Sequence, residues 1–281
     1  MPGDSDVVDG VSNVDANIAS PQSPTRVGAQ AILHRMESGK SKPFVVLCEG
    51  GVQAVVKFNK SLTMPPTEHL FEWVAAAMAE RLGLLVPPRF QIDVTEEFAN
   101  ATPNPSWRAE ARASIGLVFG SGYLAQRRQP IRNEQIPPAL TLEASEIIAF
   151  DVFIHNVDRR AGNPNLFAEG SRFVLYDHGD AFACLLPTLG ASSPPETDAL
   201  VPVIINHALF ATMKGRGQSL SRIGGLIRGL TDEWFSDLRN EVPAVWTCGM
   251  ATEKLDRLIS IMQKRRDAVD EWLPIVEGVL R

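Results

Sequence analysis

The sequence predicts an α+β protein in which strands gather in the first half of the chain and helices fill the second. Short β-branched runs bounded by glycine occur before about residue 120, and long segments with helical periodicity dominate after residue 142. The length of 281 residues, with 44% hydrophobic side chains, suits one large domain or one domain of two lobes. This segregation of strands and helices is typical of the α+β class.

Four segments in the first half have the composition of strands, with β-branched and aromatic residues between glycine, proline or polar residues. They are residues 44–48, 52–58, 90–94 and 114–119. The first two form a hairpin across Glu49-Gly50-Gly51, and a turn follows the fourth at Gly120-Ser121-Gly122. Residues 27–36 have apolar positions at helix-like spacing, and residues 95–112 are expected to be a loop or insertion.

Helical periodicity begins at Thr67, which suits an N-cap, and continues to Leu82, where Gly83 ends the segment. A second helix covers residues 142–153 and leads into His155. Two short strands follow, at 166–167 and 173–176, and residues 181–197 have the composition of a loop. About four further helices complete the chain, the last from about 255 to 279. The basic run at 264–266 is expected to lie on a solvated helix face.

The composition also restricts the binding partners and the cellular location that we expect. The net charge of -6 argues against an overall basic footprint for nucleic acid. No apolar run reaches the ~20 residues of a membrane helix, and residues 1–25 have no apolar core of a signal peptide and suit a disordered tail. The three cysteines form no CxxC pair, so neither a disulfide scaffold nor a zinc ribbon is expected. We expect a cytoplasmic protein without a membrane or nucleic-acid partner.

The segment from residue 155 to residue 179 has the clearest chemical pattern. Asp158 is followed by Asn163 and Asn165 and then by an apolar strand. Phosphoryl transfer to a hydroxyl uses this order, because the aspartate orients or accepts the proton of the nucleophile and an asparagine oxygen binds a metal. Asp177 ends the next predicted strand beside Gly179, so that its carboxylate could hold Mg²⁺ while the glycine permits a sharp turn.

Each part of this pattern is weak alone, because aspartates in such loops are usually turn formers. His155 and His178 could instead form a His/Asp metal-hydrolase cluster with the two aspartates. Since the chain has no HxH or HxxxH spacing in this segment, a structural or base role for the histidines is favoured.

Lys57 ends the second predicted strand among apolar neighbours. It could simply extend its ammonium to water, or it could clamp the phosphates of a nucleotide. The clamp needs a carboxylate partner from the following helix, where Glu72 is the first candidate and Glu68 the second. Gly50 and Gly51 could bring backbone amides to a phosphate, although their turn does not have the GxGxxG pattern and a plain hairpin is favoured.

These residues together resemble the HipA-like kinases. The resemblance lies in the string from Asn156 to Leu166, in Tyr176-Asp177-His178-Gly179, and in the surroundings of Lys57, and it covers about residues 30–215. The loop is more distantly similar to that of type II phosphatidylinositol 4-kinases. The resemblance implies a two-lobed protein-kinase-like fold that binds ATP and Mg²⁺, with a β-rich lobe at 26–126 and a helical lobe at 127–281.

The resemblance also implies a role for each site residue. Asp158 is the catalytic aspartate, Asp177 a metal ligand, Lys57 the phosphate clamp and Glu72 its partner. The metal-binding asparagine is Asn163 by residue count and Asn165 by its position before the strand, and the second is favoured.

The hypothesis that follows is transfer of the γ-phosphoryl group of Mg-ATP to a hydroxyl, first that of a protein Ser or Thr. A lipid or small molecule is the second choice of acceptor. The alternatives are a pseudokinase that binds nucleotide without turnover and a nucleotidyl transferase. The antitoxin-type partner of longer HipA proteins is possible but is not implied for this chain.

Overall fold

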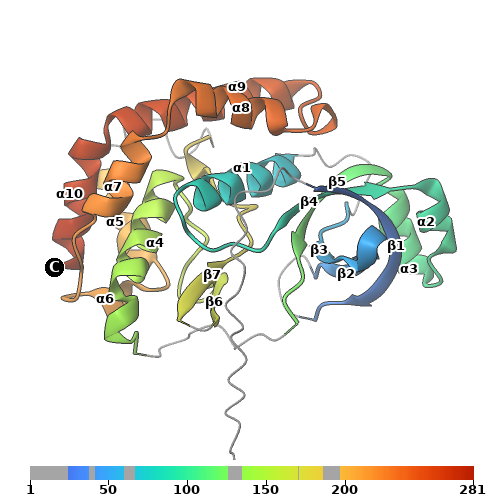
Figure 1. Ribbon diagram of the computed structural model, residues 1–281, viewed down its shortest axis with the longest axis horizontal. Coiled ribbons are helices and arrows are strands. Elements are labelled where there is room, and N and C mark those ends of the chain that lie inside the picture. Colours follow the sequence, from blue (N-terminus) through green and yellow to red (C-terminus); the bar gives the residue numbers. More distant parts are fainter. Residues whose placement is uncertain (1–24, 38–41, 60–66, 126–134, 170, 186–196) are drawn as a thin grey trace, which may run out of the picture.

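The computed structural model describes residues 25–37, 42–59, 67–125, 135–169, 171–185 and 197–281 (Figure 1). The tail predicted at residues 1–25 lies outside these ranges except for Thr25. The α+β class is confirmed, because the strands of a barrel come first and helices make up most of the rest. No helix of the described residues is long and apolar enough to span a membrane.

The N-terminal strands close into a barrel in the order β1-β2-β3-β5-β4. They are β1 (Thr25–Arg35), β2 (Phe44–Cys48), β3 (Gln53–Val56), β4 (Arg89–Val94) and β5 (Gly116–Gly122). Neighbours pair antiparallel except β1 and β4, whose parallel pairing completes the ring. Side chains such as Phe44, Val56 and Ile92 form a core of the barrel itself.

The helix-like spacing at residues 27–36 was misleading, because the segment is strand β1. Within it only Val27 is buried, so side-chain periodicity has little influence on its conformation. Backbone pairing with β2 on one side and β4 on the other fixes the strand instead. Long-range pairing of this kind overrides a local pattern.

Of the two alternatives for residues 95–112, a loop or an insertion, the loop is wrong, because the segment contains helices α2 (Glu96–Ala101) and α3 (Pro105–Arg112) between β4 and β5. Thr95 caps the first by accepting a hydrogen bond from Phe98 N at 3.1 Å. Asn104 caps the second, and Pro105 occupies its first turn. Both helices pack on the barrel core through side chains such as Phe98 and Ala111.

The turn predicted at Gly120-Ser121-Gly122 is likewise wrong, since these residues belong to β5. A Cβ on Gly120 would lie 2.2 Å from Cδ1 of Ile92, so the barrel interior has no room for a side chain there. Glycine in this strand marks a close approach inside the barrel.

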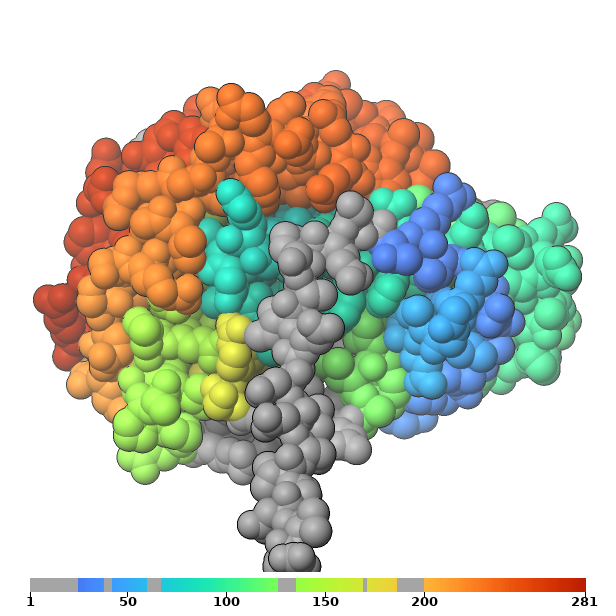
Figure 2. Space-filling model, viewed as in Figure 1, coloured from blue at the N-terminus to red at the C-terminus, as the bar shows by residue number. Residues whose placement is uncertain are grey.

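Helices form the other side of the molecule (Figure 1), and the C-terminal part of the chain, orange and red, lies along the top and left of the face drawn in Figure 2. Helix α1 (Thr67–Arg81) lies between the barrel and the remaining helices (Figure 1) and shares the larger hydrophobic core with them. The remaining helices are α4 (Thr141–Phe153), α5 (Thr197–Asn206), α6 (Phe210–Met213), α7 (Ser221–Arg228), α8 (Asp232–Glu241), α9 (Met250–Asp267) and α10 (Val269–Leu280). The single last helix expected from the sequence is therefore two, separated at Ala268.

A short hairpin of β6 (Leu166–Glu169) and β7 (Arg172–Leu175) lies against the helices, as predicted for 166–167 and 173–176. Leu175 N donates to Leu85 O at 2.9 Å, which ties the hairpin to the segment that follows α1. The segment after β7 then lies next to Lys57, and the segment after α4 contacts it there.

Candidate active site

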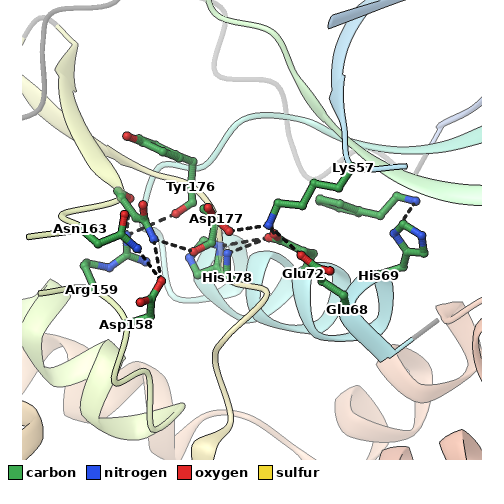
Figure 3. A network of polar contacts seen from close by, with 12 residues as sticks. Lys57, Glu68, His69, Glu72, Asp158, Arg159, Asn163, Tyr176, Asp177 and His178 are labelled. Atoms are coloured by element: carbon green, nitrogen blue, oxygen red, sulfur yellow. Dashed lines mark hydrogen bonds and ion pairs between the residues drawn. The ribbon is translucent and has the colours of Figure 1, made fainter. Parts of the chain in front are cut away.

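Polar side chains from the barrel, from α1, from the loop after α4 and from the segment after β7 converge in one network (Figure 3). The network contains every side chain predicted for the site from the sequence. Those residues are Lys57, Glu72, Asp158, Asn163, Asn165 and Asp177. Gly50 and Gly51 have no contact in it; they lie exposed at the β2–β3 turn with φ angles of 69° and 76°.

The Lys57 ammonium is surrounded by carboxylates. Its Nζ lies 2.6 Å from Asp177 Oδ1, 2.7 Å from Glu72 Oε1 and 3.1 Å from Glu68 Oε1. Burial alone would lower the pKa of Lys57, but Glu72, Asp177 and Glu68 outweigh this effect and raise the pKa well above its usual value. Lys57 is therefore a permanent cation that neutralises only part of the negative charge around it.

Glu72 is the buried member of this group. Burial raises the pKa of its carboxyl to about 7, against the opposing effect of Lys57. Its other oxygen, Oε2, accepts a hydrogen bond from His178 N at 2.8 Å. Glu72 thus joins the lysine to the backbone of the segment that carries Asp177.

Asp177, two positions after the end of β7, has a left-handed backbone with φ of 56°, and its carboxylate points toward Lys57. Burial favours its neutral form, but Lys57 overcomes this and lowers the pKa of Asp177. Gly179 permits the close approach of this segment to α1, because a Cβ there would lie 3.0 Å from Glu68 Cγ and 3.3 Å from Glu72 Oε1.

Asp158 lies in the loop after α4 and binds both candidate asparagines. Its Oδ2 accepts from Asn163 Nδ2 at 2.6 Å and from Asn165 Nδ2 at 3.3 Å. Asn165 is buried, has φ of 44°, and also donates to Asp177 O at 3.4 Å. Of the two asparagines, Asn165 is therefore the one with described contacts to both aspartate segments.

The donor set fits a hard divalent cation. Asp177 offers a carboxylate, Asn163 and Asn165 offer amide oxygens, and oxygen ligands are those that Mg²⁺ prefers. The surplus of carboxylates around Lys57 also favours an added cation. Within the described ranges, no group of three or more His, Cys, Asp or Glu side chains is arranged to hold a metal ion.

The two histidines of the segment are packed into the protein. His178 is 2% exposed, and burial, reinforced by Arg159, lowers its pKa to about 3. Its ring meets that of Phe150 edge-on. Burial and the charge of Arg265 lower the pKa of His155 to about 4. Both rings are therefore uncharged at neutral pH.

Sequence reasoning missed the buried residues beneath the loop. Arg159 is 1% exposed and donates through Nη1 to the carbonyl oxygens of Asn165 and Tyr176. Asp151 on α4 and His207 after α5 contact one another below it. A charged residue inside an apolar helix, as at Asp151, is the signal that could have found this group.

A Lys–Glu pair facing an Asp/Asn loop and a second aspartate defines the class of site that phosphotransferases use. A family model described as HipA-like kinase matches residues 29–190, which is more than half of the chain. The protein belongs to this family, and the resemblance drawn from its sequence is confirmed.

Among solved structures, similarity is found to a Helicobacter pylori proinflammatory kinase, CtkA, with 11% identity and a TM-score of 0.48; the match covers 92% of this chain and 98% of that chain. The Golgi casein kinase with Mn/ADP bound has 15% identity and a TM-score of 0.38 over 88% of this chain and 73% of its own. A second structure of the Golgi casein kinase has 15% identity and a TM-score of 0.41, and the match covers 89% of this chain and 74% of that chain. No curated protein matched the sequence.

Proposed function

We propose that the protein transfers the γ-phosphoryl group of Mg-ATP to a hydroxyl, most readily that of a Ser or Thr in a protein. One observation carries the proposal. Asn165 donates hydrogen bonds both to the Asp158 carboxylate and to Asp177 O, so the proton-accepting group and the Lys57–Asp177 cluster belong to a single site. Membership of the HipA-like kinase family supports the same chemistry.

In the proposed reaction each residue has a separate task. Lys57, held by Glu72, binds phosphate oxygens and opposes their charge. Asp177 and Asn165 hold Mg²⁺, with Asn163 as the alternative ligand. When bound, the metal supplies positive charge that offsets the charge developing on the transferred group. Asp158 orients the acceptor hydroxyl and accepts its proton.

The layout that goes with this mechanism is a β-rich lobe at 26–126 and a helical lobe at 127–281. The separate barrel core and the larger helical core support it. Helix α1 is continuous with the helical core while its Glu72 holds Lys57 of the barrel. Nucleotide bound beside Lys57 would then lie between strands and helices.

A pseudokinase is the second candidate, because the turn that carries Gly50 and Gly51 has no GxGxxG pattern and no contact with the network. Under this reading the same residues bind nucleotide without turnover.

The test is incubation of the protein with γ-labelled ATP, Mg²⁺ and a lysate, beside Asp158→Asn, Asp177→Asn and the surface control Asp270→Asn. Asp270 pairs with Arg228 and is 76% exposed. Transfer by the wild type and the control, with a loss of about 100-fold or more in both site variants, supports the proposal. Bound ATP without transfer would favour the pseudokinase. Label moving only from the α position would indicate nucleotidyl transfer.

A further inference from the structure

A single buried carboxylate below the proposed catalytic loop collects hydrogen bonds from three directions. Asp151, on α4, is fully buried. Its Oδ1 accepts from Asn156 Nδ2 at 2.9 Å, and its Oδ2 accepts from Arg159 Nε at 2.6 Å. The same Oδ2 lies 2.8 Å from Nε2 of His207. A carboxylate buried with this many partners is held in one orientation.

Two of these partners, Asn156 and Arg159, also form hydrogen bonds with the backbone of the catalytic loop. Asn156 Oδ1 accepts a hydrogen bond from the backbone N of Asp158 at 3.1 Å. Arg159 donates to the carbonyl oxygen of Asn165, whose side chain binds Asp158. Asp151 is therefore connected to both ends of the Asp158–Asn165 loop, although it touches no group proposed to meet the substrate.

The third partner, His207, comes from the corner between α5 and α6. Its Nδ1 accepts a hydrogen bond from Leu209 N at 3.1 Å, so the ring hydrogen lies on Nε2 and points to Asp151. His207 is 4% exposed. The same corner bonds the loop through its backbone, because Ala208 N donates to Arg159 O at 3.0 Å.

We infer that His207 is a positioning residue that acts through Asp151 to hold the Asp158–Asn165 loop in its working conformation. Asp151 carries one negative charge and must orient both Asn156 and Arg159. The Nε2–H of His207 and the Nε–H of Arg159 both bind Oδ2 of Asp151. Because His207 takes one side of this oxygen, Arg159 can reach it only from the other side. Without the His207 donor, the buried carboxylate is undersatisfied and the loop above it gains alternative positions. This inference rests on the proposed function only for its effect on turnover.

Paired substitutions of His207 separate this role from ordinary packing. Gln can place an amide N–H near the position of Nε2 and so retain the donor to Asp151. Asn can place its amide oxygen near the position of Nδ1 and retain only the acceptor for Leu209 N. The positioning role requires the first contact, whereas a cap on the α5–α6 corner requires the second. His34→Asn, at an exposed position on β1, is the matched control.

Amide hydrogen exchange over residues 154–166 tests the inference whether or not phosphoryl transfer occurs. His207→Asn is expected to speed exchange in this segment about tenfold or more, with wild-type rates in His207→Gln and in the control. Equal rates in the two His207 variants, or acceleration spread equally over α1 and α9, would overturn the inference. Asn156→Ala removes the side chain that links Asp151 to Asp158 N, and it is expected to give the same local acceleration. Exchange at the wild-type rate in that variant would also count against the inference.

Turnover supplies the second readout. In an active wild type, His207→Asn is expected to lower kcat about tenfold with a smaller rise, of a few fold, in KM for ATP, because the displaced loop carries Asp158 and the proposed metal ligand Asn165 while Lys57 and Glu72 keep their contact. His207→Gln is expected to remain within about threefold of the wild-type kcat. A wild type that transfers no phosphoryl group would refute the proposed function, and the exchange result would still decide the role of His207.

Discussion

Lys57 Nζ lies 2.6 Å from Oδ1 of Asp177, although 120 positions separate the two residues in the chain. The contact joins the end of a barrel strand to the end of the β6–β7 hairpin. The lysine is shared with Glu72 and Glu68, so one cation faces three carboxylates. This excess of negative charge is what a metal bound to Asp177 would offset.

Replacing the lysine tests its importance directly. Lys57→Met is expected to reduce phosphoryl transfer about 100-fold or more, equivalent to roughly 3 kcal/mol of transition-state stabilisation. Lys57→Arg keeps the charge but not the compact ammonium, so an intermediate rate is expected. Initial rates at saturating ATP measure both variants. A wild-type rate in Lys57→Met would rule out its role as the phosphate clamp.

The two asparagines can be distinguished by metal dependence. Asn165→Ala is expected to raise the Mg²⁺ concentration needed for half-maximal nucleotide binding about tenfold, because Asn165 alone of the two has a described contact with the Asp177 segment. Asn163→Ala is expected to change it less than about threefold. Titration calorimetry with ADP at several Mg²⁺ concentrations measures this. The reverse order would assign the metal to Asn163.

Gly179 is tested by adding one methyl group. In Gly179→Ala the new Cβ would meet Glu68 Cγ at 3.0 Å, and Glu68 can turn toward solvent because its side chain is 45% exposed. We expect a loss of unfolding free energy of about 1 kcal/mol and a severalfold higher KM for ATP. Gly278→Ala in α10, where nothing lies within 4 Å, should be neutral or slightly stabilising. Similar behaviour of the two variants would argue against close packing at Gly179.

His178 should contribute a loss of stability in mild acid, to which the lowered pKa of His155 adds and which the raised pKa of Glu72 opposes. Burial lowers the folded pKa of His178 to about 3 from 6.5, so the unfolded chain takes up a proton first as the pH falls below 6.5. The resulting loss of unfolding free energy between pH 7 and pH 5 is about 2 kcal/mol from this residue. Urea unfolding across this range measures it. His178→Phe should have a shallower pH dependence, and an unchanged slope would contradict the assignment.

Arg265 should be important for stability despite its charge. It is buried and donates through Nε to Phe153 O at 2.7 Å and through Nη2 to Val152 O, at the end of α4. Arg265→Leu leaves these carbonyls without their donor, and a loss of about 2–4 kcal/mol in unfolding free energy is expected. The neighbouring Lys264 is exposed, so Lys264→Leu should change stability by less than about 0.5 kcal/mol. Equal effects in urea unfolding would refute this view of Arg265.

The prediction of a solvated face at 264–266 is therefore wrong for Arg265. The sequence shows only a basic run on an amphipathic helix. Burial of one member depends on where α9 crosses the end of α4, and carbonyl oxygens at a helix terminus accept hydrogen bonds from a distant arginine as readily as from solvent. Similarly, α2 and α3 were missed although Thr95 and Asn104 are ordinary capping residues.

The sequence by itself determined the α+β class, the family, and which residues form the candidate site. Lys57, Asp158, Asn165 and Asp177 stand out because their residue types, order and flanking strands are those that phosphoryl-transfer chemistry uses. Such information is local, since it is contained in short segments whose side-chain chemistry does not depend on the rest of the chain.

Only the tertiary structure decided that β1 closes a barrel, that Lys57 meets Asp177, and that His207 lies against Asp151. Backbone pairing and buried hydrogen bonds between distant segments are selected by the packing of the whole molecule. Their energy depends on exclusion of water and on geometry within a few tenths of an ångström. No local pattern specifies either quantity, and for this reason the support beneath the proposed catalytic loop became visible only in the folded protein.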